Sequence, residues 1–126
     1  VTRDLIYNRA ALMLLPAGRR YWYASVVHHT GRRSGKKYST PVVADRVGGQ
    51  FIVPLPYGTQ VDWLRNVLTA GHATVTSQGK TYDVVSPEII DATEALPCLS
   101  RERRRTFERT GVSHFLRARI DEPQAS

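Results

Sequence analysis

Apolar residues in the first part of the chain follow a helical pattern and then strand-like patterns. They recur at roughly helical intervals between residues 3 and 15, before Pro16–Gly18 end the pattern. The run from Tyr21 to His28 is rich in aromatic and β-branched residues, which is typical of a strand buried on at least one face. The pattern predicts further strands from Tyr38 to Arg46 and from Phe51 to Leu55. The start of the chain therefore indicates one helix and three strands.

The middle of the chain predicts an amphipathic helix and a hairpin. Residues 60–70 place their apolar side chains on one helical face, with Gly71 as a C-terminal stop. Strands are expected at His72–Ser77 and Lys80–Pro87, joined by the tight turn Gln78-Gly79. Helix and hairpin thus follow each other without a long linker.

The C-terminal part predicts helices followed by one closing strand. Asp91 can cap a short helix with Glu94 at the third helical position, the arrangement of a capping box. A charged helix is expected at about Ser100 to Arg109, with Arg101 to Arg105 as a solvated face, and Ser113 to Ile120 is interpreted as a strand. Residues 121–126 are interpreted as a solvated tail.

This pattern predicts the α+β class and a small antiparallel β-barrel. Several short strands interrupted by a helix favour closure, because a closed sheet has no exposed edges. The 126 residues, 41% of them hydrophobic, fit a single domain, residues 1–126. Since the chain begins with Val1 rather than Met, a longer natural N-terminus is allowed for.

Composition narrows the class of partner and compartment. Eighteen Lys and Arg against 11 Asp and Glu give a net charge of +7, which favours anionic partners: nucleic acid, acidic lipid, or a phosphorylated or carboxylated ligand. The single cysteine, Cys98, excludes an internal disulfide and a cysteine zinc cluster, and the four histidines lack ligand spacing, so no metal is expected. No apolar run reaches the roughly 20 residues that span a bilayer. We expect a cytoplasmic protein that contacts membranes only peripherally.

The segment from Thr30 to Pro41 offers the clearest candidate chemistry. It combines two glycines, several hydroxyls and four cationic side chains within six positions, at residues 32, 33, 36 and 37. Arg can grip a phosphate in a fork while exposed amides of the turn also donate. The alternative is a solvated hairpin tip whose charges serve solubility. From the residues alone, both interpretations stay open.

Three ordered motifs extend this interpretation. The hairpin TGRRSGKKYSTP, the strand FIVPLPYG and the helix start VDWLRNVLTAG resemble the deazaflavin (coenzyme F(420))-dependent nitroreductase and quinone reductase family of actinobacteria. The likeness runs from about Val27 to Asp91. It implies a split β-barrel related to flavin-binding pyridoxamine-phosphate-oxidase-like proteins, with flanking helices. It also implies an oxidoreductase that passes a hydride from reduced coenzyme F(420) to an apolar enone, quinone or nitro acceptor.

The resemblance also implies a set of cofactor-binding residues. The residues of the basic turn meet the phosphate and the anionic oligoglutamate tail of the cofactor. Pro41 and Val42 lie beside its ring system, and the backbone from Val53 to Gly58 lines the deazaflavin. The implied residues are Arg32, Arg33, Ser34, Gly35, Lys36, Pro41, Val42, Val53, Pro54, Leu55, Pro56, Tyr57, Gly58, Trp63 and Asn66. For Trp63, the alternative is a core aromatic at helical spacing.

The proton donor is the point at which this chain departs from the family. Relatives commonly carry tyrosines in the late segment, whereas residues 99–120 contain none. Tyr57, His114 and solvent are the remaining candidates. Strand alternation sends His28 and His29 to opposite faces, so one of them could face the cofactor, although a strand histidine is more often structural.

Other functions fit the same features. Flavin mononucleotide on the same fold would use the basic turn for its single phosphate. A non-enzymatic lipid- or fatty-acid-binding module would use the pocket without turnover. A nucleic-acid binder would explain the charge, but no recognised nucleic-acid motif accompanies it. Barrels of this kind are usually dimers, so a homodimer is expected.

Overall fold

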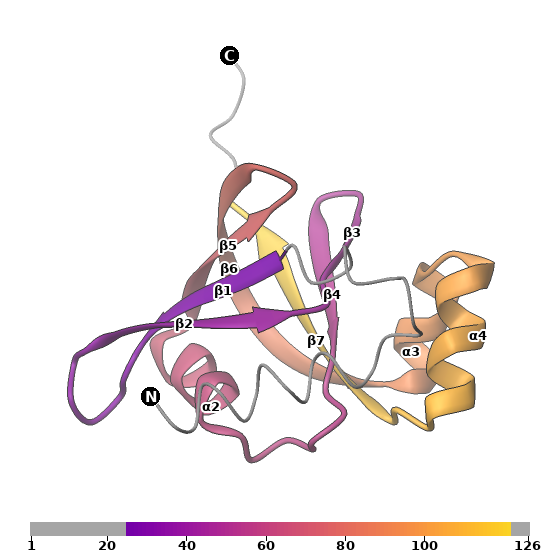
Figure 1. The fold of residues 1–126 in the computed structure, drawn as a ribbon, viewed down its shortest axis with the longest axis horizontal. Coiled ribbons are helices and arrows are strands. Elements are labelled where there is room, and N and C mark those ends of the chain that lie inside the picture. The colour runs from indigo at the N-terminus through magenta and orange to yellow at the C-terminus, as the bar shows by residue number, and fades with distance from the viewer. Residues whose placement is uncertain (1–24, 122–126) are drawn as a thin grey trace.

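A computed structural model describes residues 25–121, which form a curled antiparallel sheet with helices packed against it (Figure 1). The strands are β1 (Ser25–Thr30), β2 (Lys37–Val42), β3 (Asp45–Val47), β4 (Gln50–Pro54), β5 (His72–Ser77), β6 (Lys80–Asp91) and β7 (His114–Ile120). The helices are α2 (Asp62–Ala70), α3 (Ala92–Ala95) and α4 (Arg101–Thr110), and a 3-10 turn, η2 (Leu96–Cys98), follows α3. The helix expected at residues 3–15, the start of the first expected strand and residues 122–126 lie outside the described residues.

The order of the strands explains why the sheet becomes a barrel. The order is β2-β1-β5-β6-β7-β4-β3, and every neighbouring pair is antiparallel. The two edge strands, β2 and β3, are nevertheless joined by Val43 and Ala44 alone. Such a short link spans at most about 11 Å, so the two edges must curl toward each other. The ladders of the described strands do not pair β2 with β3, and a slot remains between the edges. The predicted α+β split barrel is confirmed.

The same link corrects one prediction. The sequence pattern predicted a single strand from Tyr38 to Arg46, but the chain divides there into β2 and β3. Val42 and Val43 are both buried, which breaks the alternation of a strand, because each faces a different hydrophobic core. The run of β-branched residues thus conceals a corner of the barrel.

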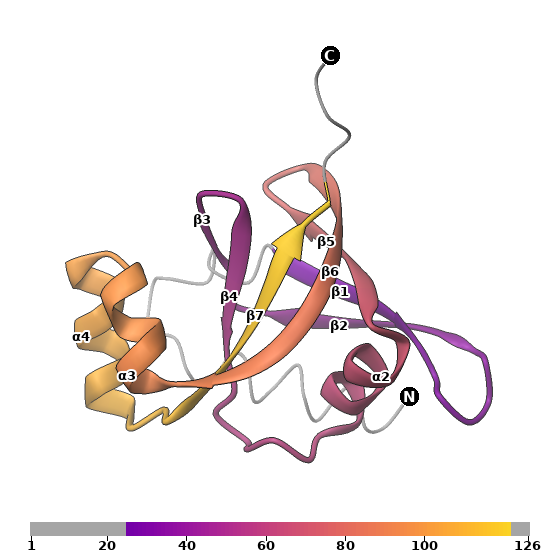
Figure 2. The same ribbon diagram turned by 180° about the vertical axis from the view of Figure 1, so that it is seen from behind.

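Two hydrophobic cores hold the elements together. The inner core fills the barrel, and α2 covers one end of it with Trp63, Leu64 and Val67. The outer core lies between the sheet and the pair α3 and α4, and includes Phe107 and Phe115. Figure 2 shows α2 and the α3–α4 pair at separate places on the sheet. Strand β7 serves both cores because its side chains alternate between the two faces.

Strand β6 is longer than predicted. The sequence pattern ended it at Pro87, because proline cannot donate to a ladder, but the strand continues to Asp91 through a bulge. Val85 pairs with Arg119 and Glu88 with Arg117, so β6 carries one extra residue there. The preceding hairpin is as predicted, since Gln78 and Gly79 have φ of 51° and 80°, as a tight primed turn requires.

The charged helix α4 is more structural than expected. The Ser100 hydroxyl caps the start of the helix, because it accepts from the Arg103 amide at 3.2 Å. However, Arg103 Nε lies 2.9 Å from Asp45 Oδ1, and Arg104 donates to the Leu96 and Leu99 carbonyls at 3.1 and 3.0 Å. The expectation of a wholly solvated arginine face is therefore wrong for Arg103 and Arg104. They join α4 to β3 and to the preceding turn.

One of the two hydrogen bonds of the capping box predicted for α3 is present. Asp91 Oδ1 accepts from the Glu94 amide at 3.0 Å, so the aspartate does start the helix. The Glu94 carboxylate instead lies 2.8 Å from Arg117 Nη1 on β7. The glutamate thus ties the helix to the sheet.

The pair of Asp45 and Arg103 gives a first prediction. Burial raises the pKa of the Asp45 carboxyl, and Arg103 opposes that rise. Arg103→Met is expected to destabilise the fold at pH 7 by about 2 kcal/mol, less than for a fully buried pair because both side chains keep some exposure. A carboxyl whose pKa is higher in the folded state than in the unfolded state favours folding at pH values below the unfolded pKa, and this contribution is lost as pH rises through the folded pKa. The destabilisation caused by Arg103→Met should therefore be smaller at pH 4 than at pH 7.

Urea unfolding at pH 4 and pH 7 measures this difference. Arg105→Met, on the exposed side of the same helix, is the control and should change little. An equal loss for both variants, or a deficit that does not depend on pH, would contradict the role given to Arg103.

Candidate functional site

An apolar recess lies at the end of the edge strand β2. Its walls are the end of β2, the loop that follows β4, and the start of α2, and it encloses about 430 Å³ that include open solvent. The loop is shaped by its prolines and by two backbone bonds: Leu55 N donates to the His114 carbonyl at 3.0 Å, and Gly58 N to the Leu55 carbonyl at 3.2 Å. Gly58 has φ of 86°, where a side chain would be strained. The lining residues are Thr40, Pro41, Val42, Val43, Pro54, Leu55, Pro56, Tyr57, Gly58, Val61 and Trp63.

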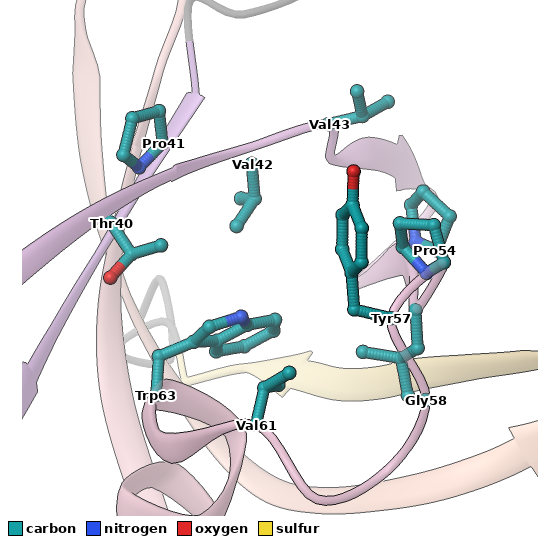
Figure 3. Close-up of a pocket in the computed structure, with 11 residues that line it drawn as sticks. Thr40, Pro41, Val42, Val43, Pro54, Tyr57, Gly58, Val61 and Trp63 are labelled. Atoms are coloured by element: carbon teal, nitrogen blue, oxygen red, sulfur yellow. The ribbon is translucent and has the colours of Figure 1, made fainter. Parts of the chain in front are cut away.

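The recess is suited to a flat, apolar molecule. Figure 3 shows Val42, Tyr57 and Trp63 arranged around one space, with Val61 below them. Concave surfaces with apolar and aromatic walls and few polar groups are the usual sites for small ligands. Trp63 is both a core residue and a wall of the recess, since it is buried and packs with the inner core. The two interpretations of this tryptophan are thus compatible.

Tyr57 carries the hydroxyl most available to such a ligand. Its side chain is half exposed and lines the recess. Partial burial raises the pKa of its phenol above the ordinary value of 10.0, so the group stays protonated at neutral pH. It can therefore donate a proton. His114 does not line this recess: it is exposed at the start of β7, with Nδ1 3.0 Å from the Ser113 hydroxyl.

The basic hairpin tip lies beside α2 and projects beyond the barrel (Figures 1 and 2). Its glycines have distinct roles. A Cβ at Gly31 would lie 2.7 Å from the Ser34 hydroxyl and 2.9 Å from the Tyr38 ring, so a larger residue does not fit. Gly35 has φ of 72°, where a residue other than glycine would be strained. The turn is consequently tight.

Most amides near the start and end of this turn have partners within the protein. The amides of Gly31 and Gly35 donate to backbone carbonyls at 2.8 and 2.9 Å, and that of Lys36 donates to the Ser34 hydroxyl at 3.2 Å. The Arg32 amide is bound to the side chain of Asn66. An anion at the tip must therefore be gripped mainly by side chains. Arg33 and Lys36 are exposed and suited to this.

A chain of buried hydrogen bonds connects the recess wall with the tip. Thr40 Oγ1 lies 3.0 Å from His29 Nε2, and His29 Nδ1 lies 3.0 Å from Asn66 Nδ2. Asn66 Oδ1 accepts from the Arg32 amide at 3.1 Å and from Arg32 Nη1 at 2.8 Å. The Arg32 guanidinium also lies 3.4 Å from Asp62 Oδ1 at the start of α2. Helix α2 thereby holds the first residue of the basic run.

The structure brings one part of the predicted cofactor set together at the recess and another part at the tip. Pro41, Val42, the segment 54–58 and Trp63 line the recess. Arg32, Arg33, Ser34, Gly35 and Lys36 form the hairpin tip. Val53 and Asn66 are not among the lining residues: Val53 packs in the inner core, and Asn66 lies between α2 and the tip.

Sequence reasoning missed Thr40, Val43 and Val61 as lining residues, although Thr40 and Val43 adjoin the predicted Pro41 and Val42, and Val61 lies two positions before the predicted Trp63. These places in the sequence were the available signal. It also missed the link from His29 to Asn66, which joins residues 37 positions apart and leaves no local pattern.

Metal-binding clusters and membrane-spanning helices are both absent from the described residues. Within residues 25–121, His, Cys, Asp and Glu side chains do not gather in groups of three or more that could hold a metal. In the same part of the chain, the helices are too short or too polar to cross a membrane.

Comparisons with known proteins complete the description. A family model described as F(420)H(2)-dependent quinone reductase matches residues 11–107. The fold is similar to that of a Listeria innocua protein assigned as a pyridoxamine 5′-phosphate oxidase, with TM-score 0.58, 7% identity, and 93% and 94% of the two chains covered. It is also similar to General Stress Protein 26 of Bacillus anthracis str. Sterne, with TM-score 0.54, 11% identity, and 92% and 86% of the two chains covered. A third similar structure is a protein described as an F(420) reductase, with TM-score 0.52, 11% identity, and 86% and 97% of the two chains covered. No curated protein matches the sequence.

Proposed function

The chain belongs to the F(420)H(2)-dependent quinone reductase family, and on that premise we propose that it reduces a flat, apolar quinone, enone or nitro compound with reduced coenzyme F(420). The observation that carries this proposal is the apolar recess at the end of β2, the strand that leads from the recess to the basic hairpin tip. An apolar wall favours an acceptor with little charge, because a buried charge would lack a partner there. The basic hairpin favours an anionic cofactor.

The two parts of the site match the two parts of the cofactor. The flat ring system fits between Val42, Tyr57 and Trp63, and the anionic tail fits the tip, where Arg33 and Lys36 are exposed. Strand β2 joins these parts and is an edge strand, so its outer backbone edge can receive a ligand. From Pro41 to Lys37 it covers about 13 Å at roughly 3.3 Å per residue.

When bound, the cofactor supplies the hydride, and the protein supplies orientation and a dry pocket. Val42, Leu55 and Trp63 are buried walls that exclude water from one side of the recess. Arg32 adds a fixed positive charge at the side of the tip that faces α2, because Asn66 and Asp62 hold its guanidinium. Tyr57 donates the proton that completes the reduction, or solvent donates it through the open side of the recess.

A pair of titrations tests the proposal. Purified protein is titrated with oxidised coenzyme F(420) and, separately, with flavin mononucleotide, and the reduced deazaflavin is then mixed with quinones, enones and nitroaromatics. We expect tight binding of the deazaflavin and turnover with at least one acceptor class. Binding of flavin mononucleotide alone would assign the other cofactor. Bound acyl chains without turnover would assign a lipid-binding module.

Tyr57→Phe gives a prediction about proton delivery. We expect kcat to fall by about 10- to 100-fold, at or below the low end of general-acid effects because solvent can partly replace an exposed donor. The Kd for the cofactor should change little, since the ring of the side chain is kept. Because the phenol pKa is raised, kcat of the unmodified enzyme should not lose this donor between pH 6 and 9. An unchanged kcat in the variant would assign the proton to solvent.

Two further expectations accompany the proposal. A homodimer is implied by the resemblance, and sedimentation of the purified protein measures it. Peripheral contact with acidic lipid, suggested by the charge of +7, is measured by co-sedimentation with anionic vesicles.

A further inference from the structure

We propose that His29 is a positioning residue of the cofactor site, which sets the place of the basic hairpin through Asn66. This inference rests on the proposed function, because the hairpin is the part of the site that binds the anionic tail. His29 does not line the recess, and it belongs to the buried part of β1. Its effect on the cofactor is therefore exerted through its neighbours.

The link from Thr40 through His29 and Asn66 to Arg32 is continuous and buried. The exposed fractions of His29, Asn66 and Thr40 are 8%, 5% and 1%, so their hydrogen bonds are shielded from water. Buried polar groups cost free energy when they lose a partner, so this link favours one arrangement. It ends at the Arg32 amide, which is the first backbone group inside the turn. The link thus joins β1, α2 and the hairpin.

Each hydrogen bond of the link has a defined direction. The Asn66 oxygen accepts both the amide and the Nη1 donor of Arg32, so its nitrogen must face His29. His29 Nδ1 then has to accept, and His29 Nε2–H donates to the Thr40 hydroxyl. Without an acceptor at this position, the buried Asn66 amide would lose the partner of its nitrogen. A rotated amide would turn that nitrogen toward two Arg32 donors.

The ring of His29 is itself held in place by the hairpin. Its centroid lies 5.7 Å from that of Tyr38 on β2, and the two planes are inclined by 22°. Tyr38 in turn packs beside Gly31, where there is no room for a Cβ. His29 lies on β1 and contacts Tyr38 and Thr40 on β2, so it is held by both strands of the hairpin, as a positioning role requires.

The adjacent histidine provides a matched control. His28 also makes two side-chain hydrogen bonds, each of 2.9 Å, but they lead to Ser39 on β2 and to Thr76 on β5. It shares the strand, the residue type and the number of bonds with His29. Neither of these two bonds leads to α2 or to the tip. A general effect of losing a strand histidine should appear in both variants, whereas an effect on the hairpin tip through Asn66 should appear only when His29 is replaced.

The test compares His29→Leu, His29→Asn and His28→Leu. The Kd for oxidised coenzyme F(420) is measured by fluorescence titration, and hydrogen exchange of the Arg32 amide is measured by NMR without cofactor. His29→Leu should weaken binding about tenfold, the effect of one hydrogen bond to a charged group, and should speed exchange at Arg32. His29→Asn keeps an acceptor near Nδ1 and should restore most of the affinity. His28→Leu should leave both measurements unchanged, although it can lower the unfolding midpoint.

The outcomes separate this inference from the proposed function. If the unmodified protein binds deazaflavin and His29→Leu binds it equally well, the positioning role is wrong. Equal losses in His28→Leu and His29→Leu would also overturn it, because the effect would then be a general one. If the unmodified protein binds no deazaflavin, the proposed function fails. Exchange at the Arg32 amide still tests the link separately, because unchanged exchange in His29→Leu would show that His29 does not position the hairpin.

Discussion

Replacing Arg33 and Lys36 together by alanine is expected to raise the Kd for oxidised coenzyme F(420) about 100-fold. Each charge-assisted hydrogen bond contributes roughly 1.5 to 3 kcal/mol, and the lower end applies to exposed groups, which gives about tenfold for each residue. Both side chains are exposed, and neither has an ion-pair partner within residues 25–121. Their removal should therefore leave the free energy of unfolding within about 0.5 kcal/mol. Arg32 is left in place because it holds the hairpin to α2.

Fluorescence titration at two salt concentrations measures this effect. The difference between the variant and the unmodified protein should narrow at high salt, because exposed charges are then screened. The control is Arg105→Ala with Arg109→Ala, which removes the same charge from the exposed side of α4. If the control weakens binding as much as the hairpin variant, net charge rather than the hairpin holds the cofactor.

Val61→Trp is expected to abolish detectable binding of the cofactor ring, a loss of more than about 100-fold, or ~2.7 kcal/mol. Val61 lines the recess immediately before α2 and is only partly buried, so a larger side chain can extend into the recess. Its φ of −69° is accessible to any residue, so the backbone need not change. The indole would then occupy the space between Tyr57 and Trp63.

Gln60→Trp is the matched control for this variant. Gln60 is exposed and does not line the recess, so its replacement adds the same indole outside the site. Binding is followed by titration, and the unfolding midpoint shows whether each variant is folded. A folded Val61→Trp variant that binds the cofactor with unchanged Kd would place the ring elsewhere.

The sequence predicted most of the elements because local patterns determine them. The amphipathic face of α2, the Gln78-Gly79 turn and the alternation in β7 are each visible within about ten residues. The predicted recess residues also came together, because the prolines and Gly58 shape the loop locally. The hairpin was identified from its glycines and charges, which again lie close together in the sequence.

The predictions that were wrong involve contacts between distant parts of the chain. Whether Val43 continues a strand or turns a corner depends on the outer core, which forms only when α4 packs on the sheet. The bulge in β6 depends on its register with β7. Likewise, Arg103 is paired because Asp45, 58 positions earlier, lies opposite it. No local periodicity records such partners.

The place of β7 in the sheet has a consequence for the order of synthesis. This last strand of the described chain lies between β6 and β4, so without it the sheet consists of two separate parts, β2-β1-β5-β6 and β4-β3. Long-range pairings of this kind form late, because the intervening chain must first be closed into a loop. On the ribosome, the two walls of the recess would remain on separate sheets until residues 114–120 emerge. A nascent chain that stops before β7 should therefore be unable to retain the cofactor, even though every proposed binding residue has already been made.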